Sequence, residues 1–411
     1  MKGVGKGVVI VGAGHAGGTA AAFLRQWGYE APITIIGDEP LAPYQRPPLS
    51  KAWLTGEADA ESLLLRPASF YAENEIGLWL STQVERLDRE AKAVVLAGGE
   101  TLPYDRLIIA SGARARRIPL PGLDLDGVLA LRTAADADQL KAALGPGKRV
   151  AVIGGGYIGL EAAASARALG AEVVVIEREP RVLARVACEA LSTFFQDYHR
   201  AHGVRFVVNA GVEAIVGGDG RAAAVKLAGA ELIEADVFLV GVGAQPNQEL
   251  PEAAGIACND GIVVDLEART SDPDVFAIGD CTRRPMPIYG GRMHRLESVP
   301  NALEQAKQAA AAIVGRAPPP GEVPWFWSDQ YDLKLQIAGL PFDAAETVIR
   351  GDPASAHFAV FHLDAEHHVQ AVEAINAPPE FMMGRLLIGQ RKVVAPERLR
   401  DMSISMKEVA A

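Results

Sequence analysis

The sequence predicts an α/β protein in which two parallel-sheet units of the same type precede a C-terminal α+β domain. Two observations support this class. A short run of branched apolar residues that stops at a glycine-rich turn and continues as a helix occurs near the N-terminus, and the same pattern recurs at residues 149–170. Strand-like segments with two helical patches follow beyond residue 322. A chain of 411 residues is long enough for two or three domains.

The first pattern runs from Val8 into the glycine motif Gly12-Ala13-Gly14-His15-Ala16-Gly17. In this spacing the first glycine makes the tight turn, the second lets the backbone approach a pyrophosphate, and the third lets the helix pack on the strand. The free amides at the helix N-terminus favour phosphate. Asp38 and Glu39 follow the next apolar strand, where an acid binds an adenosine ribose. The pattern predicts a Rossmann-like dinucleotide site.

The second pattern has the same order of elements. Arg149–Ile153 leads into Gly154-Gly155-Gly156-Tyr157-Ile158-Gly159, and the following strand ends at Glu177. An acid there can accept hydrogen bonds from both ribose hydroxyls of NADH and repels the 2′-phosphate of NADPH. Arg178 and Arg181 carry the opposite charge and weaken this preference. Two such motifs in one chain indicate two dinucleotides, most economically one flavin and one nicotinamide nucleotide.

Turns and linkers predict how the chain divides. We expect a discontinuous FAD-binding domain from residues 1–113 and 246–321, with an NAD-binding domain of residues 114–245 inserted in it. The run Pro318-Pro319-Pro320-Gly321 has the composition of a linker. Residues 322–411 then form the C-terminal α+β domain.

Further candidate site residues each have a purely structural alternative. Lys51 ends the proline-stiffened run Arg46-Pro47-Pro48-Leu49-Ser50, where a cation can steady charge on a reduced flavin or be an ordinary surface lysine. Glu161 can pair with Lys51 or only complement a helix dipole. Asp280 can bind ribityl hydroxyls or form a turn. A helix starting near Val299 can direct its N-terminus toward the flavin carbonyls.

Composition excludes several classes of function. The net charge of −11 disfavours nucleic acid and anionic membranes as partners. The N-terminal apolar run is too short for a signal peptide or a membrane span, so we expect a cytoplasmic protein. The three cysteines, Cys188, Cys258 and Cys281, have neither disulfide nor metal spacing. His362, His367 and His368 lack a companion acid or cysteine cluster in the sequence, so we expect surface histidines and no metal site.

A set of motifs together resembles one family along essentially the whole chain. They are the two glycine motifs, RPPLSK at 46–51, GGGYIGLE at 154–161, TSDPDVFAIGD at 270–280, ESVPNALEQA at 297–306 and PWFWSDQY at 324–331. They are similar to the FAD-dependent, NADH-linked ferredoxin reductases of oxygenase systems, of the putidaredoxin reductase type. The resemblance implies a glutathione-reductase-like fold. It also implies electron transfer from NADH through FAD to a [2Fe-2S] ferredoxin that serves a cytochrome P450 or an aromatic-ring dioxygenase.

The resemblance carries site residues over one by one. FAD contacts fall on Gly12, Gly14, Ala16, Gly17, Asp38, Lys51, Val84, Arg132, Asp280 and Val299. Nicotinamide-nucleotide contacts fall on Gly154, Gly156, Tyr157, Ile158, Gly159, Glu161 and Glu177. Lys51 and Glu161 match a pair at the flavin N5 edge, and Trp327 matches a tryptophan near the exposed flavin edge.

Two other functions use the same architecture. NADH oxidases, peroxidases and disulfide reductases place a reactive cysteine at the flavin, and flavoproteins of the apoptosis-inducing-factor type use NADH binding as a conformational signal. The segment through Lys51 has no cysteine, and the chain has no Cys-x-x-Cys pair. We therefore expect a ferredoxin reductase that needs no dithiol, acting as a monomer or weak dimer.

Overall fold

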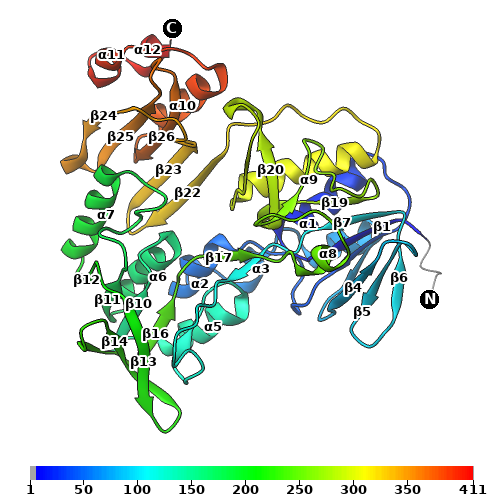
Figure 1. Cartoon of the computed structure of the whole chain (residues 1–411), viewed down its shortest axis with the longest axis horizontal. Coiled ribbons are helices and arrows are strands. Elements are labelled where there is room, and N and C mark those ends of the chain that lie inside the picture. The colour runs from blue at the N-terminus through cyan, green and yellow to red at the C-terminus, as the bar shows by residue number, and fades with distance from the viewer. Residues whose placement is uncertain (1–5, 411) are drawn as a thin grey trace. The chain divides into compact units, whose positions relative to one another are not determined.

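The structure, a computed structural model, describes residues 6–410 and resolves them into two compact units (Figure 1). The first contains the segment up to Gln45, Ala60–Arg114 and Gln245–Phe326. The second contains Arg46–Asp59, Ala115–Ala244 and the chain from Trp327 onward. The short segment that carries Lys51 therefore groups with the second unit, although the sequence places it inside the first nucleotide-binding domain.

A five-stranded parallel sheet in the order β19-β7-β1-β2-β3 forms the centre of the first unit. Alternate residues of each strand face opposite sides, which creates two cores. On one side, alanines of helices α1 and α9 pack against Ile10, Ile35 and Phe276. On the other side lies an antiparallel sheet in the order β4-β5-β6. The main elements are β1 (Val8–Val11), α1 (His15–Gln26), β2 (Ile33–Ile36), β3 (Ile76–Trp79), β4 (Val84–Asp88), β5 (Ala93–Leu96), β6 (Thr101–Pro103), β7 (Arg106–Ile109), β19 (Val275–Ala277) and α9 (Val299–Ile313).

Helix α9 begins as the sequence predicts. Ser298 is its N-cap, and its side chain accepts the backbone N–H of Asn301 at 3.2 Å, while Pro300 occupies the first turn. Shorter elements complete this unit, and the chain passes between the units in β8 and β17. These elements are α3 (Ala60–Leu63), α4 (Ala68–Glu73), β8 (Ala113–Ala115), β17 (Ala244–Pro246), α8 (Glu249–Ala253), β18 (Ile262–Val263), η2 (Gly279–Cys281), β20 (Thr282–Met286), η3 (Pro287–Tyr289) and β21 (Arg292–His294).

The second unit repeats the parallel-sheet design in the order β12-β11-β10-β16-β9. A three-stranded antiparallel sheet, β13-β14-β15, packs on it through Ile215, Val225 and Ile233. The elements are η1 (Pro47–Ser50), α2 (Ala52–Thr55), β9 (Val128–Leu129), α5 (Ala134–Ala143), β10 (Arg149–Ile153), α6 (Tyr157–Ala168), β11 (Glu172–Ile176), α7 (Glu189–Ala201), β12 (Val204–Val207), β13 (Val212–Gly218), β14 (Arg221–Leu227), β15 (Leu232–Glu234) and β16 (Val237–Val240).

The C-terminal part of the second unit is the predicted α+β structure. Its five-stranded sheet has the order β22-β23-β26-β25-β24, and the pairings among the last four strands are antiparallel. Three helices follow, where the sequence indicates two. The elements are β22 (Trp325–Gln330), β23 (Leu333–Gly339), β24 (Glu346–Asp352), η4 (Pro353–Ser355), β25 (His357–Leu363), β26 (Val369–Ile375), α10 (Pro378–Gln390), α11 (Pro396–Arg400) and α12 (Met406–Ala410).

The predicted fold class is confirmed: two parallel-sheet nucleotide-binding units and a C-terminal α+β region. Within residues 6–410, none of the helices combines the length and the apolar character that crossing a bilayer requires.

Candidate functional site

The first glycine motif has the geometry that its spacing predicts. Gly12 has φ +117°, and a Cβ on it would lie 2.1 Å from the carbonyl oxygen of Ala110. A Cβ on Gly17 would lie 2.1 Å from the carbonyl oxygen of Gly12, so this glycine lets helix α1 pack against the turn. A Cβ on Gly14 would meet nothing within 4 Å. The backbone is therefore open at Gly14, where a pyrophosphate would approach.

The second motif repeats this arrangement position by position. Gly154 has φ +110°, and a Cβ on it would lie 2.4 Å from the carbonyl oxygen of Gly241. A Cβ on Gly159 would lie 2.2 Å from the carbonyl oxygen of Gly154, whereas Gly156 has open space around it. Ile158, in the first turn of α6, is 48% exposed, which leaves an apolar surface at this helix N-terminus. Both motifs are therefore shaped to receive a dinucleotide.

Asp280 lies beside the first motif, as predicted. It follows strand β19 in the short helix η2. The preceding Gly279 has φ +80°, and a Cβ on it would lie 3.1 Å from the Cβ of Ala16 in α1 and 4.0 Å from that of Ala302 in α9. The acid, the glycine motif and the first turn of α9 thus meet at one edge of the sheet. Val299, a predicted FAD contact, is the first residue of that helix.

His15 was not predicted as a site residue, although it lies inside the glycine motif. Its Nδ1 atom is buried without a hydrogen-bond partner. Burial lowers the pKa of His15, and the nearby charge of Asp280 opposes this shift. A buried ring nitrogen without a partner, next to the open backbone at Gly14, fits a site that binds a polar ligand. The residues of the first unit therefore fit FAD.

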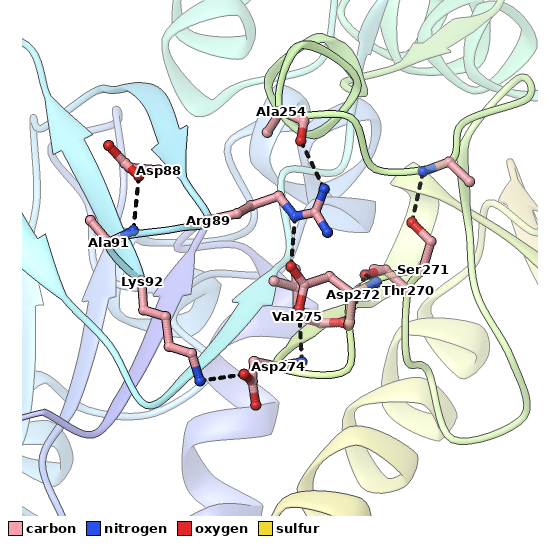
Figure 2. A network of polar contacts seen from close by, with 11 residues as sticks. Asp88, Arg89, Ala91, Lys92, Ala254, Thr270, Ser271, Asp272, Asp274 and Val275 are labelled. Carbon is pink, nitrogen blue, oxygen red and sulfur yellow. Dashed lines mark hydrogen bonds and ion pairs between the residues drawn. The ribbon is translucent and has the colours of Figure 1, made fainter.

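Charged contacts fix the segment that leads into β19 and Asp280 (Figure 2). Arg89, in the turn between β4 and β5, donates to Asp272 at 2.6 Å and to the carbonyl oxygen of Ala254 at 3.2 Å. Lys92 pairs with Asp274, and the backbone N–H of Asp274 donates to Asp272 at 3.0 Å. These contacts explain the acidic residues in the TSDPD part of the motif, because each anchors the loop before the strand.

The ribose acids of the two motifs occupy different positions. In the second motif Glu177 immediately follows β11, and its carboxylate accepts the backbone N–H of Gly155 at 2.7 Å and that of Glu179 at 2.9 Å. In the first motif the equivalent position is Gly37, on which a Cβ would lie 2.5 Å from the Cβ of Ala13. The side chain of Ala13 therefore leaves no room for a side chain at position 37, directly after β2. The predicted acid Asp38 lies one residue further on and is exposed.

Of the two arginines near Glu177, only one is exposed. Arg181 donates to the carbonyl oxygens of Ala187, Cys188 and Ala184 at 2.9, 3.3 and 3.2 Å, and also to Ser192. Its guanidinium thereby holds the loop before α7. Arg178 is 78% exposed and pairs with Glu179 at 2.9 Å. Of these two arginines, Arg178 is therefore the one more accessible to a 2′-phosphate.

Lys51 and Glu161 form the predicted ion pair within the second unit. The 3₁₀ helix η1 begins with two prolines and ends before Lys51, which precedes α2. Lys51 Nζ lies 2.8 Å from Glu161 Oε2, and the two side chains are 20% and 3% exposed. Ser50 Oγ donates to the same carboxylate oxygen at 2.5 Å. Because Glu161 is buried with these donors, it is much more than a helix-dipole residue.

The C-terminal motif reaches the same carboxylate through a residue that sequence reasoning missed. Ser328 Oγ donates to Glu161 Oε1 at 2.6 Å, and Gln330 Nε2 donates to Ser328 Oγ at 3.1 Å. Ser328 and Gln330 are buried on one face of β22, while Trp327 is half-buried on the opposite face. The polar residues within the aromatic WFWSDQY run were a signal, since alternate positions of a strand share a face.

Two further predicted FAD contacts lie on other elements. Val84 is the half-buried first residue of β4 in the first unit. Arg132 belongs to the second unit, where its backbone N–H donates to Asp136 at 3.0 Å and its carbonyl oxygen accepts from Arg46 at 2.5 Å. Their assignment to FAD stays a prediction.

The expectation for the C-terminal histidines is wrong for two of them. His362 is 4% exposed, with Nε2 at 3.5 Å from Glu373, and Cys188 lies in the same cluster. Glu373 accepts the backbone N–H of Cys188 at 3.2 Å, at the start of α7. His368 lies 3.2 Å from Asp364. Strands β25 and β26 and the start of α7 bring Cys188, His362 and Glu373 together, so the proximity of these three residues is invisible in the sequence.

The cysteines have no activated thiol. Burial, followed by the charge of Glu373, raises the pKa of Cys188 to about 12. Burial raises the pKa of Cys258 to about 11 and also raises that of Cys281, which is fully buried. A thiol reacts as its thiolate, so these groups are inert near neutral pH.

Comparisons with known proteins agree with this geometry. The pyridine nucleotide-disulphide oxidoreductase family matches residues 6–306, and a reductase C-terminal domain matches residues 325–410. The chain is 52% identical over 403 residues to a probable ferredoxin reductase, CtmF, of Castellaniella defragrans, covering 98% of both chains.

Two solved structures are also similar. The covalent putidaredoxin reductase–putidaredoxin complex gives a TM-score of 0.95 at 40% identity, covering 98% of both chains. The ferredoxin reductase for the CYP199A2 system of Rhodopseudomonas palustris gives 0.95 at 41%, covering 99% of this chain and 100% of that one. These matches confirm the predicted resemblance, the fold and the two cofactors. The chain therefore belongs to the pyridine nucleotide-disulphide oxidoreductase family, as an FAD- and NAD(H)-dependent oxidoreductase with a reductase C-terminal domain.

Proposed function

We propose that this chain is an NADH-dependent ferredoxin reductase that passes electrons through FAD to a [2Fe-2S] ferredoxin serving an oxygenase. The observation that carries the proposal is the pair of glycine motifs, in which three matching positions have the same steric role. Such a chain is built for two dinucleotides. The absence of an activated thiol among residues 6–410 argues against the oxidase, peroxidase and disulfide-reductase alternatives.

In this proposal the first unit holds FAD through its glycine motif, Asp280 and the N-terminus of α9. Bound FAD supplies the conversion between two-electron and one-electron transfer. The amides near Gly14 bind phosphate, and Asp280 accepts hydrogen bonds from ribityl hydroxyls. Val84 and Asp38 serve the same cofactor. We retain the division into an FAD domain, an NAD domain and a C-terminal domain as the functional organisation.

The second unit holds NADH at its own glycine motif. Glu177 accepts hydrogen bonds from the adenosine ribose, while Tyr157 and Ile158 give the nucleotide an apolar surface. Lys51 and Glu161 serve the reacting edge of the flavin. The ammonium orients groups there by charge, and the carboxylate holds the ammonium in place. No side chain is required to exchange a proton with the nicotinamide.

The partner is an iron–sulfur protein, and the terminal acceptor is a cytochrome P450 or an aromatic-ring dioxygenase. We propose that Trp327 covers the flavin edge from which electrons leave. The enzyme acts as a monomer or weak dimer, without nucleic acid or membrane. Its three free thiols support a cytoplasmic location, where cysteines stay reduced.

One measurement separates this function from its rivals. Purified protein loaded with FAD is mixed with NADH and an added [2Fe-2S] ferredoxin, and ferredoxin reduction is followed by absorbance under anaerobic conditions. We expect reduction that depends on NADH, on FAD and on the ferredoxin. In a parallel aerobic assay without ferredoxin, consumption of oxygen or of added peroxide at the same rate would identify an oxidase or peroxidase. NADH binding without multiple turnover would identify a sensor.

A further inference from the structure

A chain of buried hydrogen bonds runs from Glu161 through the C-terminal sheet to helix α7. Ser328 Oγ lies 2.6 Å from Glu161 Oε1, and Gln330 Nε2 lies 3.1 Å from Ser328 Oγ. Gln330 Oε1 lies 2.8 Å from His199 Nε2, and His199 Nδ1 lies 3.3 Å from the Tyr331 hydroxyl. Glu161, Ser328, Gln330 and His199 are each at most 3% exposed.

The chemistry of the linked groups gives every bond the same direction. A carboxylate only accepts, so the single Ser328 proton goes to Glu161, and Ser328 must accept from the Gln330 amide nitrogen. The Gln330 oxygen then accepts from His199 Nε2–H. In the neutral imidazole the other nitrogen, Nδ1, accepts from Tyr331. All four donors thus point toward Glu161, and aligned hydrogen bonds strengthen one another.

The surroundings keep His199 and Tyr331 in the protonation states that this direction of hydrogen bonding requires. Burial lowers the pKa of His199 to about 4, so the ring is neutral near pH 7. Burial raises the pKa of Tyr331 to about 12, so its hydroxyl keeps its proton. The Tyr331 ring also stacks on His202, with centroids 4.1 Å apart at 20°. The groups facing His199 are Gln330, Tyr331, His202 and the ring of Phe206.

The backbone at Tyr331 supports a specific role for this end of the chain. Tyr331 has φ +55° in the turn between β22 and β23. A left-handed conformation is unfavourable for an ordinary L-residue, and glycine or asparagine is the usual choice there. The tyrosine ring compensates through its contacts with His199 and His202.

We infer that Ser328, Gln330 and His199 are positioning residues that fix the Glu161 carboxylate for its partner Lys51. Ser328 occupies Oε1 with its proton, which leaves Oε2 to Lys51 and Ser50. The C-terminal sheet thereby acts on electron transfer through the ion pair, in addition to any role in docking. This inference rests on the proposed function, because that function gives Lys51 and Glu161 their place at the flavin.

Each variant that tests this inference changes the hydrogen-bonding group of one residue. Ser328→Ala removes the donor to Glu161, and Ser328→Thr keeps a hydroxyl. Gln330→Glu keeps shape but replaces the amide donor by an acceptor, so two carboxylates compete for the Ser328 proton. Ser192→Ala is the matched control, since Ser192 is a buried serine outside this hydrogen-bond chain that accepts from Arg181 and donates to the Val182 carbonyl at 2.6 Å. Thermal unfolding and FAD content verify that each variant is folded.

The first readout is reduction of the bound flavin by NADH in a stopped-flow instrument, without ferredoxin. Ser328→Ala and Gln330→Glu should lower the limiting rate about tenfold, the effect of losing one hydrogen bond to a charged group. The NADH dissociation constant should change less than about twofold, because neither Ser328 nor Gln330 is assigned to the nucleotide. Ser328→Thr should recover most of the rate, and Ser192→Ala should match the wild type.

Two further readouts separate positioning from a general structural role. In a Glu161→Gln background, Ser328→Ala should add less than about a twofold loss, since the serine acts through that carboxylate. Nitrogen-15 NMR of histidine-labelled protein should show His199 as the Nε2–H tautomer, whether or not FAD is bound. An Nδ1–H tautomer, a full additional loss in the Glu161→Gln background, or equal rates for Ser328→Ala and Ser192→Ala would overturn the inference. Failure to reduce ferredoxin would instead refute the proposed function, because none of these readouts uses ferredoxin.

Discussion

The carboxylate of Glu177 accepts the backbone N–H of Gly155 at 2.7 Å, which fixes the acid against the turn of the second glycine motif. A carboxylate held in this way cannot swing aside to admit a phosphate. Both of its oxygens keep lone pairs for the two hydroxyls of an unmodified ribose. We propose that the position of this acid, one residue earlier after its strand than Asp38, makes the second site selective for an unmodified ribose.

The protein should prefer NADH over NADPH by at least about tenfold in kcat/KM. The reason is that Glu177 repels a 2′-phosphate, and one unsatisfied polar contact costs about 1–3 kcal/mol. Steady-state kinetics with the two nucleotides measure the ratio, and Glu177→Gln should reduce it. Arg178→Ala should raise it slightly, because Arg178 is the exposed cation nearby. Equal kcat/KM values in the wild type would show that Arg178 outweighs the acid.

The two open glycines should separate loss of cofactor from loss of fold. Gly14→Val should fold but bind no FAD, since its Cβ meets no protein atom and lies where the phosphate belongs. Gly156→Val should keep FAD yet bind NADH at least about tenfold more weakly. Gly17→Ala is the contrasting variant, because its Cβ would lie 2.1 Å from a carbonyl oxygen and should lower thermal stability. Flavin absorbance, NADH titration and thermal unfolding measure the three effects. Normal FAD binding by a folded Gly14→Val protein would show that the pyrophosphate lies elsewhere.

These glycine roles could be predicted from sequence because each depends on residues within one strand, turn and helix. The hydrogen-bond chain from Glu161 to His199 could not be predicted from sequence. Its members are distant along the polypeptide, because Ser328 lies 167 residues beyond Glu161 and Gln330 lies 131 residues beyond His199. The cluster of Cys188, His362 and Glu373 could not be predicted from sequence for the same reason. Its members come from β25, β26 and the start of α7.

The Lys51–Glu161 pair lies between these cases. The prolines alone predict a rigid turn that fixes the direction of the Lys51 side chain, and the 3₁₀ helix η1 confirms the turn. Its partner was named only through the family resemblance. The structure adds that Ser50 and Ser328 also donate to the carboxylate, which no local pattern indicates.

Catalysis should need no cysteine. Replacing Cys188, Cys258 and Cys281 together by serine should leave ferredoxin reduction within about threefold of the wild type. The reason is that all three thiols have raised pKa values and are partly or fully buried. The triple variant is assayed after its FAD content is matched, since serine at the buried Cys281 costs stability. A folded, FAD-loaded variant without turnover would mean that a thiol takes part.

His199 should make the protein less stable in mild acid. Its pKa is 6.5 when exposed and about 4 in the fold, so between these values the unfolded state binds a proton that the folded state does not. The free energy of unfolding should therefore fall as pH decreases from about 6.5 to about 4, by on the order of 3 kcal/mol from this group. Denaturant titrations at several pH values measure it. His199→Gln should flatten this slope, while substitution of the exposed His357 by Asn should not. If His199→Gln leaves the slope unchanged, the pKa of His199 is the same in the folded and unfolded states, and the prediction is wrong.

Trp327 and Ser328 are neighbours on opposite faces of β22, and their substitutions should slow different half-reactions. Ser328 acts on Glu161 and hence on reduction of the flavin by NADH. We assign Trp327 to the edge from which ferredoxin takes electrons, where an aromatic ring shields the flavin from water and keeps a packed route to the cluster. Trp327→Ala should therefore slow ferredoxin reduction at least about fivefold more than flavin reduction, with Ser328→Ala giving the reverse pattern. Trp327→Phe, which keeps an aromatic ring, should recover most of the rate. Stopped-flow measurement of each half-reaction decides the matter: if Trp327→Ala slows only reduction by NADH, the tryptophan belongs to the nicotinamide site and electrons leave by another edge.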